Sequence, residues 1–102
     1  MAVKITVTSV RPTVDVEWYT RETEHETYIN THFISTGKMS KDSLEISADG
    51  LTKTLVMSWP DAADRVDYQN HADHPLIAAD QQALKAHGYA NNIKGTVTWE
   101  TV

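Results

Sequence analysis

Residues 44–59 read Leu-Glu-Ile-Ser-Ala-Asp-Gly-Leu-Thr-Lys-Thr-Leu-Val-Met-Ser-Trp, two β-type runs on either side of Asp49-Gly50. Glycine after aspartate is typical of a tight hairpin turn, because glycine adopts the positive φ that such turns require. Before the turn, Leu44 and Ile46 alternate with polar residues, and after it a second run extends from Leu51 to Trp59. The sequence therefore predicts two antiparallel strands joined by a hairpin.

A helix is predicted on the N-terminal side of this hairpin. Aromatic, histidine and apolar side chains recur there at the i, i+3, i+4, i+7 and i+8 spacing of one helix face: His25, Tyr28, Ile29, His32 and Phe33. We expect the helix to begin at Thr20 or Thr23. Residues 23–26 match a capping box, in which the side chains of Thr23 and Glu26 bond to backbone N–H groups of the first turn. Gly37 suits the position just after its last turn.

A second helical stretch follows the hairpin, and we expect it to be broken. Asp61 suits its start, because a negative charge is favourable at the positive end of a helix dipole. The helical pattern stops between Asn70 and His74, and Pro75 restarts it at a first-turn position, where proline is tolerated. Gly88 is expected to end this second piece.

Strands are also expected near both ends of the chain. Residues 3–7 alternate apolar and polar side chains, and the β-type pattern continues to Trp18. We expect one long first strand with a bulge or kink at Arg11-Pro12, because proline cannot adopt the positive φ of a two-residue turn. The last strand, preceded by Gly95, carries Val97 and Trp99 on one face.

The elements follow the order strand, helix, strand, strand, helix, strand, which is the β-α-β-β-α-β order of ferredoxin-like sheets. The expected fold class is α+β, an antiparallel sheet with the helices on one face, and residues 1–102 form a single domain. One face of the strands is apolar and should lie under the helices. The other face is rich in threonine and either meets water or meets a second copy across a two-fold axis: Thr6, Thr8, Thr52, Thr54, Thr96 and Thr98.

Composition excludes several classes of function. The chain has 9 Lys and Arg against 14 Asp and Glu, and its cations are scattered, so neither nucleic acid nor an anionic membrane is an expected partner. The lack of cysteine excludes disulfides, thiolate catalysis and cysteine metal sites. No window approaches the ~18 apolar residues of a membrane span. The N-terminal residues lack the apolar core of a signal peptide, so a cytoplasmic location is expected.

Histidines and aromatic residues are the candidates for a functional site. His71 and His74, with Asp67 one turn before His71, form the densest cluster of proton- and metal-binding side chains. We predict an acid/base role for the two histidines and no metal or cofactor, because Pro75 disfavours the continuous helix that would align both imidazoles. The alternative is a solvated helix junction. Four further residues are predicted to line a ligand site: Trp59, Tyr68, Thr54 and Thr98.

One passage resembles a known superfamily. Residues 59–64 (Trp-Pro-Asp-Ala-Ala-Asp) and 67–75 (Asp-Tyr-Gln-Asn-His-Ala-Asp-His-Pro) are similar to the strand-to-helix passage of the dimeric α+β barrel superfamily, whose best-known members are the antibiotic-biosynthesis-monooxygenase-like domains. Arg11-Pro12 and residues 46–52 resemble small dimeric ferredoxin-like proteins of unassigned function from marine environmental sequences. The resemblance implies a homodimer whose sheets pack face to face.

The heme-degrading branch of that superfamily uses an asparagine on the first strand and a tryptophan and a histidine in the second helix. This chain has no asparagine between Val3 and Val10, has Tyr68 near the place of that tryptophan, and has Ala78 near the place of that histidine. Heme oxygenation is therefore not expected. The hydroxyl-rich strand face would also be a poor lining for a large apolar cofactor.

Three classes of function stay open on these grounds. The first is a homodimeric module that binds a small polar ligand or acts without catalysis. The second is a cofactor-poor enzyme of the dimeric α+β barrel type, resembling a monooxygenase or an isomerase. The third is a structural or assembly subunit, such as one of a virus-like particle.

Overall fold

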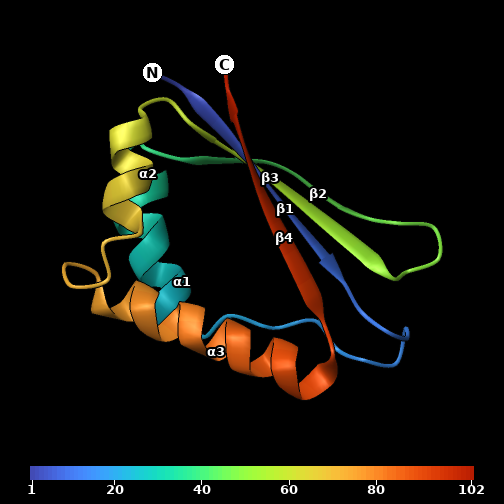
Figure 1. Ribbon diagram of the computed structural model, residues 1–102. Helices are drawn as coiled ribbons and strands as arrows, with labels where there is room; N and C mark the ends of the chain where they lie inside the picture. Colours follow the sequence, from blue (N-terminus) through green and yellow to red (C-terminus); the bar gives the residue numbers. More distant parts are fainter.

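The computed structural model describes residues 1–102 as an open four-stranded antiparallel sheet with its helices on one side (Figure 1). The strands are β1 (Val3–Val10), β2 (Ser40–Ile46), β3 (Thr52–Trp59) and β4 (Lys94–Thr101). The helices are α1 (Thr23–Ile29), which continues into the π-helical turn η1 (Asn30–Ile34), α2 (Ala62–Tyr68) and α3 (Pro75–Asn91). The strand order β2-β3-β1-β4 and the element order confirm the predicted ferredoxin-like α+β class.

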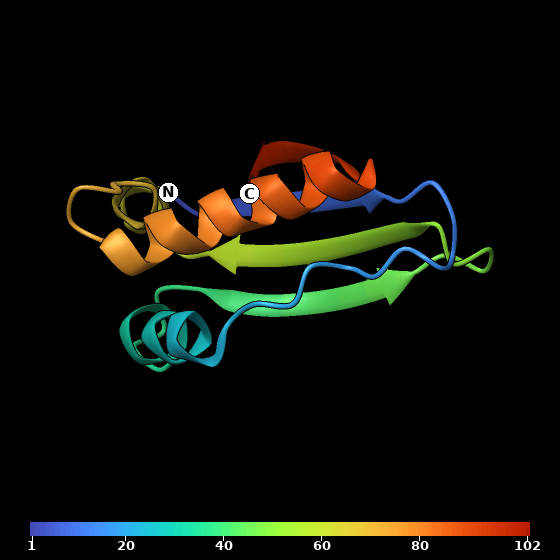
Figure 2. The same ribbon diagram turned by 90° about the horizontal axis from the view of Figure 1, so that it is seen from below.

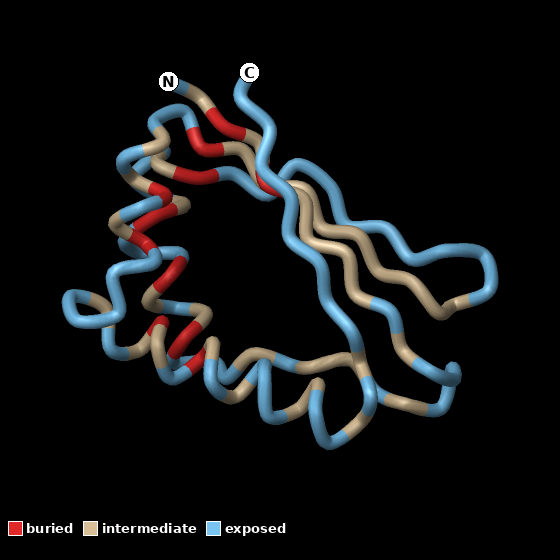
Figure 3. Tube along the Cα trace, viewed as in Figure 1, coloured by how far each residue is buried: buried red, intermediate tan, exposed pale blue.

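The helices all lie on one side of the sheet (Figure 1), and the buried core lies at one end of it. We call the face toward them, which carries Val3, Ile5 and Val7, the inner face, and the opposite, threonine-rich face the outer face. Figure 2 shows α3 running along the inner side of the strands, and Figure 3 shows the buried residues gathered near the start of β1 and on the helices. The buried apolar core comprises Val3, Ile5, Ile29, Phe33, Met39, Trp59, Tyr68 and Ile77.

The far half of the inner face is uncovered, against the expectation that the helices would bury the whole apolar face. Three of its large apolar side chains remain more than half exposed: Leu44, Ile46 and Val97. This open half of the inner face leaves room for a groove.

The predicted break in the second helical stretch is confirmed. α2 ends at Tyr68, and α3 begins with Pro75 as its first residue. Asp61 stands just before α2, and its Oδ1 accepts a hydrogen bond from the backbone N–H of Ala63 at 2.9 Å. The carboxylate therefore satisfies one of the free donors at the helix start.

The predicted long first strand is wrong. β1 ends at Val10, and residues 11–22 form an irregular segment. The strand ends because its partners do: Val10 pairs with Thr52, the first residue of β3, and with Lys94, the first residue of β4. The Arg11 side chain then donates to the carbonyls of Gly50 at 2.7 Å and Val16 at 2.8 Å, which holds the segment against the hairpin.

The hairpin is confirmed, but its loop is longer than a two-residue turn. Ser47 donates its N–H to the carbonyl of Thr52, and Gly50 donates to the carbonyl of Ser47. Gly50 has a φ of +77°, the positive value on which the prediction of a turn at this glycine was based. Asp49 Oδ1 accepts from the Leu51 N–H at 3.0 Å and stabilises the loop locally.

The predicted start of α1 at Thr23 is confirmed, but the predicted capping box and the predicted end of α3 at Gly88 are wrong. The capping box is not formed, because Thr23 is itself the first helical residue and Glu22 before it makes no side-chain cap hydrogen bond. Gly88 does not end α3, which continues to Asn91 before Asn92 turns left-handed at a φ of 58°. The Ile93 carbonyl oxygen instead packs closely against Gly88, since an added Cβ at this position would lie only 3.2 Å from that oxygen. None of the helices has the length and apolar character to cross a membrane.

Candidate functional site

The uncovered part of the inner face forms a groove with α3 and the segment that leads into α1. The groove consists of two adjoining cavities of about 370 and 560 Å³. Both are lined by Val7 and Lys53 from the sheet, Tyr19 from the segment and Leu84 from α3. Because a groove of this size matches a small organic molecule, it is the candidate site of this chain.

The groove is rich in cations although the protein is acidic. Five of the nine Lys and Arg residues line it, with a single carboxylate, that of Glu26: Arg21, Lys41, Lys53, Lys85 and Lys94. The Glu26 carboxylate is already bonded, to Arg21 Nη1 at 3.0 Å and to Lys41 Nζ at 3.3 Å. These contacts leave the remaining cations of the groove without a partner carboxylate.

Lys53 is a partly buried cation without a carboxylate partner. It lies on β3, and burial, followed by the nearby charges of Arg11 and Arg21, lowers the pKa of its ammonium group. Its Nζ lies 5.0 Å from the ring centroid of Trp18, and the Arg11 guanidinium lies over the same ring at 4.6 Å. A cation that is partly desolvated and repelled by its neighbours gains most from an added anion.

Trp18 contributes a further free donor. Its Nε1 is buried and has no hydrogen-bond partner, and its ring lines the larger cavity. Buried indole N–H groups are normally bonded, so this one marks a place where an acceptor is missing. The groove thus offers donors and positive charge, and it lacks acceptors.

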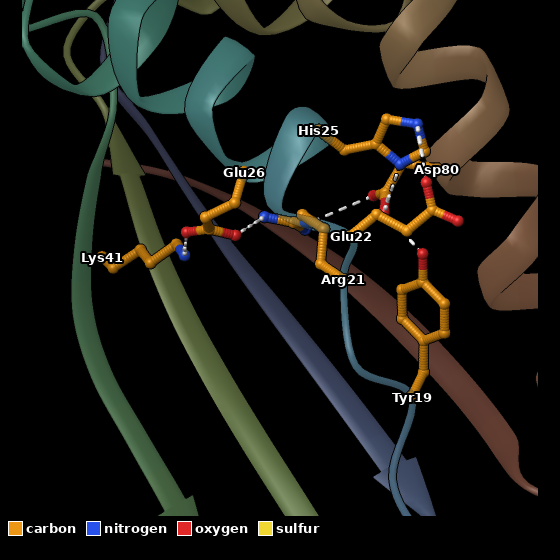
Figure 4. Close-up of polar contacts among 7 residues, drawn as sticks. All are labelled: Tyr19, Arg21, Glu22, His25, Glu26, Lys41 and Asp80. Atoms are coloured by element: carbon orange, nitrogen blue, oxygen red, sulfur yellow. Dashed lines mark hydrogen bonds and ion pairs between the residues drawn. The ribbon is translucent and has the colours of Figure 1, made fainter.

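A polar network anchors the groove wall on α3 (Figure 4). At its centre is the carboxylate of Asp80, which is only 1% exposed. Tyr19 donates its hydroxyl to Asp80 at 2.8 Å, Arg21 Nε donates at 3.1 Å, and His25 Nδ1 lies 3.6 Å away. These contacts tie α3 to α1 and to the segment before it, and they hold Tyr19 at the groove.

Asp80 is a residue of this network that was not predicted from the sequence. The residue lies three positions after Ile77 and four before Leu84, within the apolar stripe of α3. A carboxylate at a core position of a helix is rare unless it is paired, so this placement was the available signal.

Burial, together with the hydrogen bond to Asp80, raises the pKa of the Tyr19 hydroxyl from 10.0 to about 12. A raised pKa means that folding favours the protonated phenol, so this contribution to stability is complete below pH 10 and is lost as the pH rises to about 12. We expect the free energy of unfolding to fall over that window, and to fall less steeply in Tyr19→Phe. Denaturant unfolding at a series of alkaline pH values measures this. Burial also raises the pKa of Tyr68, so part of the slope should persist in the variant; equal slopes in both proteins would contradict the prediction.

The structure separates the two predicted histidines. His74 lies between two polar partners, with its Nδ1 2.7 Å from the Tyr28 hydroxyl and its Nε2 3.1 Å from Asp67 Oδ2. His71 is exposed on the loop before it and joins neither contact. The Tyr28–His74–Asp67 chain lies in the helical layer and lines neither cavity of the groove.

The sheet separates the four predicted ligand residues into two pairs. Trp59 and Tyr68 pack edge to face with Phe33 and with each other on the inner side, where Trp59 is completely buried. Thr54 and Thr98 each lie beside β1 on the outer face, opposite Thr8 and Thr6 respectively. No single ligand can therefore contact all four side chains.

Comparison with known proteins finds similarity in shape only. No family model matches the chain, and no curated protein matches it. The solved structures similar to it include Rv0793 from Mycobacterium tuberculosis, with 14% identity, a TM-score of 0.49, and coverage of 98% of this chain and 94% of that one. Another is a dimeric ferredoxin-like protein from an uncultured marine organism, with 9% identity, a TM-score of 0.48, and coverage of 99% and 94%. Neither likeness supports the transfer of a ligand or an activity to this chain.

Proposed function

We propose that this protein binds a small organic anion in the groove between the inner face and α3. The observation that carries the proposal is the imbalance of the groove, where Lys53, Lys85 and Lys94 have no carboxylate partner and the one lining carboxylate, that of Glu26, is already bonded to Arg21 and Lys41. Val7, Leu55 and Val97 supply an apolar floor for a carbon skeleton. The carboxylate of a ligand bound beside Lys53 would supply the acceptor that the site lacks.

This proposal narrows the ligand-binding class expected from the sequence from a polar ligand to an anionic, partly apolar one. The polar end belongs beside Lys53 and Trp18, where the donors converge. The apolar end belongs toward Leu84 and Val97, because these side chains line the groove without adding charge. The ligand therefore lies across the strands, from Lys53 on β3 over β1 to Val97 on β4.

Substituting Lys53 by glutamate is expected to weaken anion binding at least tenfold, because an attractive contact becomes a repulsive one in a partly desolvated site. The probe is naphthoate, with neutral naphthamide as its uncharged counterpart, and binding is measured by calorimetry or by perturbation of amide NMR signals. Wild type should bind naphthoate more tightly than naphthamide.

The matched control is Lys4→Glu, which makes the same change of charge on the outer face. It should leave naphthoate affinity nearly unchanged. Equal losses of naphthoate affinity in Lys53→Glu and Lys4→Glu would mean that the effect comes from the net charge of the protein alone. Equal affinity of the wild type for naphthoate and naphthamide would refute the anion site.

Catalysis is a second candidate, favoured by the position of His74 between a phenol and a carboxylate. An imidazole oriented by Asp67 is the arrangement of a general base, with the Tyr28 hydroxyl as the group whose proton it takes. The groove does not reach this chain of residues. A substrate of the His74 site would therefore bind at the helical layer, and turnover lost in His74→Gln but kept in Lys53→Glu would separate the two functions.

A further inference from the structure

The two edges of the sheet differ in how they are protected. β2 is interrupted by a bulge between Lys41 and Ser43, and the Asp42 side chain in the bulge bonds to Ser40 and Ser58. β4 pairs with β1 without interruption from Lys94 to Thr101, and all eight of its residues are exposed. Bulges and charges protect an edge from pairing with another chain. The β2 edge is therefore protected, whereas the β4 edge is free to pair with a strand of another chain.

The free hydrogen-bonding groups of β4 belong to its odd-numbered residues. Val102 donates its N–H to the Ala2 carbonyl, so the even-numbered residues of this strand point their backbone groups toward β1. In an antiparallel ladder the direction alternates with each residue. The N–H and C=O groups of residues 95, 97, 99 and 101 therefore point away from the sheet.

We propose that β4 pairs antiparallel with β4 of a second copy of this chain, centred on Val97 in each. In this register Lys94 of each copy lies opposite Glu100 of the other, which forms two reciprocal ion pairs. Thr96 lies opposite Thr98, a hydrogen-bonding pair typical of neighbouring strands. A shift of the register by two residues toward the C-terminus sets Glu100 opposite Thr96 and leaves Lys94 without a partner.

The inner face of the same register is complementary as well. Val97 meets Val97 at the two-fold axis, and Trp99 of each copy lies over Gly95 of the other. In the single chain Val97 is 52% exposed and Trp99 48% exposed, and the pairing covers both. An aromatic side chain opposite a glycine is a stabilising cross-strand arrangement.

Gly95 supports the pairing independently. Glycine weakens a strand, and a glycine inside one usually marks a bulge, a bend or a close approach of another group. Within this chain none of these applies, because the ladder is regular at Gly95 and the nearest atom to an added Cβ, the Thr8 carbonyl oxygen, lies 3.9 Å away. A second copy whose Trp99 covers this residue supplies the reason that the single chain lacks.

The outer face is a weaker place for a second copy. Val10 and Val56 are the only apolar residues on this polar face, and its strands also carry four charged residues: Lys4, Glu45, Lys94 and Glu100. Packing two such faces together would bury hydroxyls and charges for little apolar area.

The edge pairing differs from the face-to-face dimer expected from the sequence, and it brings the second copy's Trp99 to the mouth of the groove that Gly95 and Val97 line. This last consequence rests on the proposed function.

Charge reversal tests the register. Sedimentation of the wild type over a wide range of concentrations should show a monomer–dimer equilibrium. Lys94→Glu and Glu100→Lys should each weaken the dimer about tenfold, because each places two like-charged pairs across the edge. The double variant Lys94→Glu/Glu100→Lys should return the dissociation constant to near the wild-type value. A monomer at every concentration, or a double variant no tighter than the single ones, overturns the proposal.

A second pair of variants distinguishes the edge from the outer face. Val97→Lys sets two lysines together at the two-fold axis of the edge dimer, whereas Thr54→Lys places the same group in the middle of the outer face. Dissociation by Val97→Lys alone supports the edge, and dissociation by Thr54→Lys alone overturns it. Circular dichroism confirms that each variant is folded. Naphthoate affinity is measured separately, so failure of the anion site leaves the sedimentation result standing.

Discussion

Replacing Asp80 by alanine is expected to lower the free energy of unfolding by about 3–5 kcal/mol, the loss typical of removing one partner from a buried charged pair. The carboxylate is 1% exposed and accepts from both Tyr19 and Arg21. Without it the Arg21 cation keeps its desolvation cost and loses the buried one of its two anionic partners, and the Tyr19 hydroxyl loses its acceptor. Urea unfolding followed by tryptophan fluorescence measures the change.

Two controls identify the cause of this loss. Glu26→Gln alters the more exposed end of the same network, where each of the two ion pairs of Glu26 contributes at most about 1 kcal/mol, so a smaller effect is expected. Asp80→Leu combined with Arg21→Met replaces the pair with apolar side chains and should be less harmful than Asp80→Ala. A loss below about 1 kcal/mol in Asp80→Ala would mean that the network does not hold α3 in place.

Trp59→Ala is expected to cost about 3–5 kcal/mol, since removal of a large buried aromatic side chain loses its transfer free energy and leaves a cavity. Trp59 is completely buried and packs against Phe33 and Tyr68, with the Arg65 guanidinium 5.7 Å from its ring centroid. Thermal and denaturant unfolding measure the loss.

The control for this variant is Tyr89→Ala, because Tyr89 is 85% exposed and its removal should change stability by no more than about 0.5 kcal/mol. The two interpretations of Trp59 also predict different binding. If Trp59 belongs to the core, Trp59→Phe should keep wild-type affinity for naphthoate. A marked loss of affinity in a well-folded Trp59→Phe would return Trp59 to the ligand site predicted from the sequence.

The fold was predictable because its signals are local. Asp49-Gly50 marks the hairpin, and Pro75 marks the break between α2 and α3. The end of β1 was not predictable in this way, because the alternation through Val14 and Val16 is indistinguishable from a strand until the partner strands are known. Strand length depends on β3 and β4, which are distant in sequence, and pattern alone contains no information about where they begin.

The site was less predictable than the fold. The sequence cluster around His71 and His74 suggested proximity, yet the loop before α3 points His71 into solvent and brings His74 to Tyr28, which is 46 positions away in the chain. The cations of the groove are scattered through the sequence, so their convergence is visible only after the strands and α3 have assembled. The scattered lysines of the sequence argued against a nucleic-acid surface, but they carried no information about a small cationic groove.

The central position of β1 has a consequence for how the chain acquires its structure during synthesis. β1 is the first strand to leave the ribosome, and one of its two neighbours is β4, the last of the four strands to be translated. Its inner-face residues Val3 and Ile5 must therefore stay without a complete sheet until β4 has been made. We expect the sheet to close only after β4 has been translated, and β1 to be exposed to aggregation or to a chaperone until then.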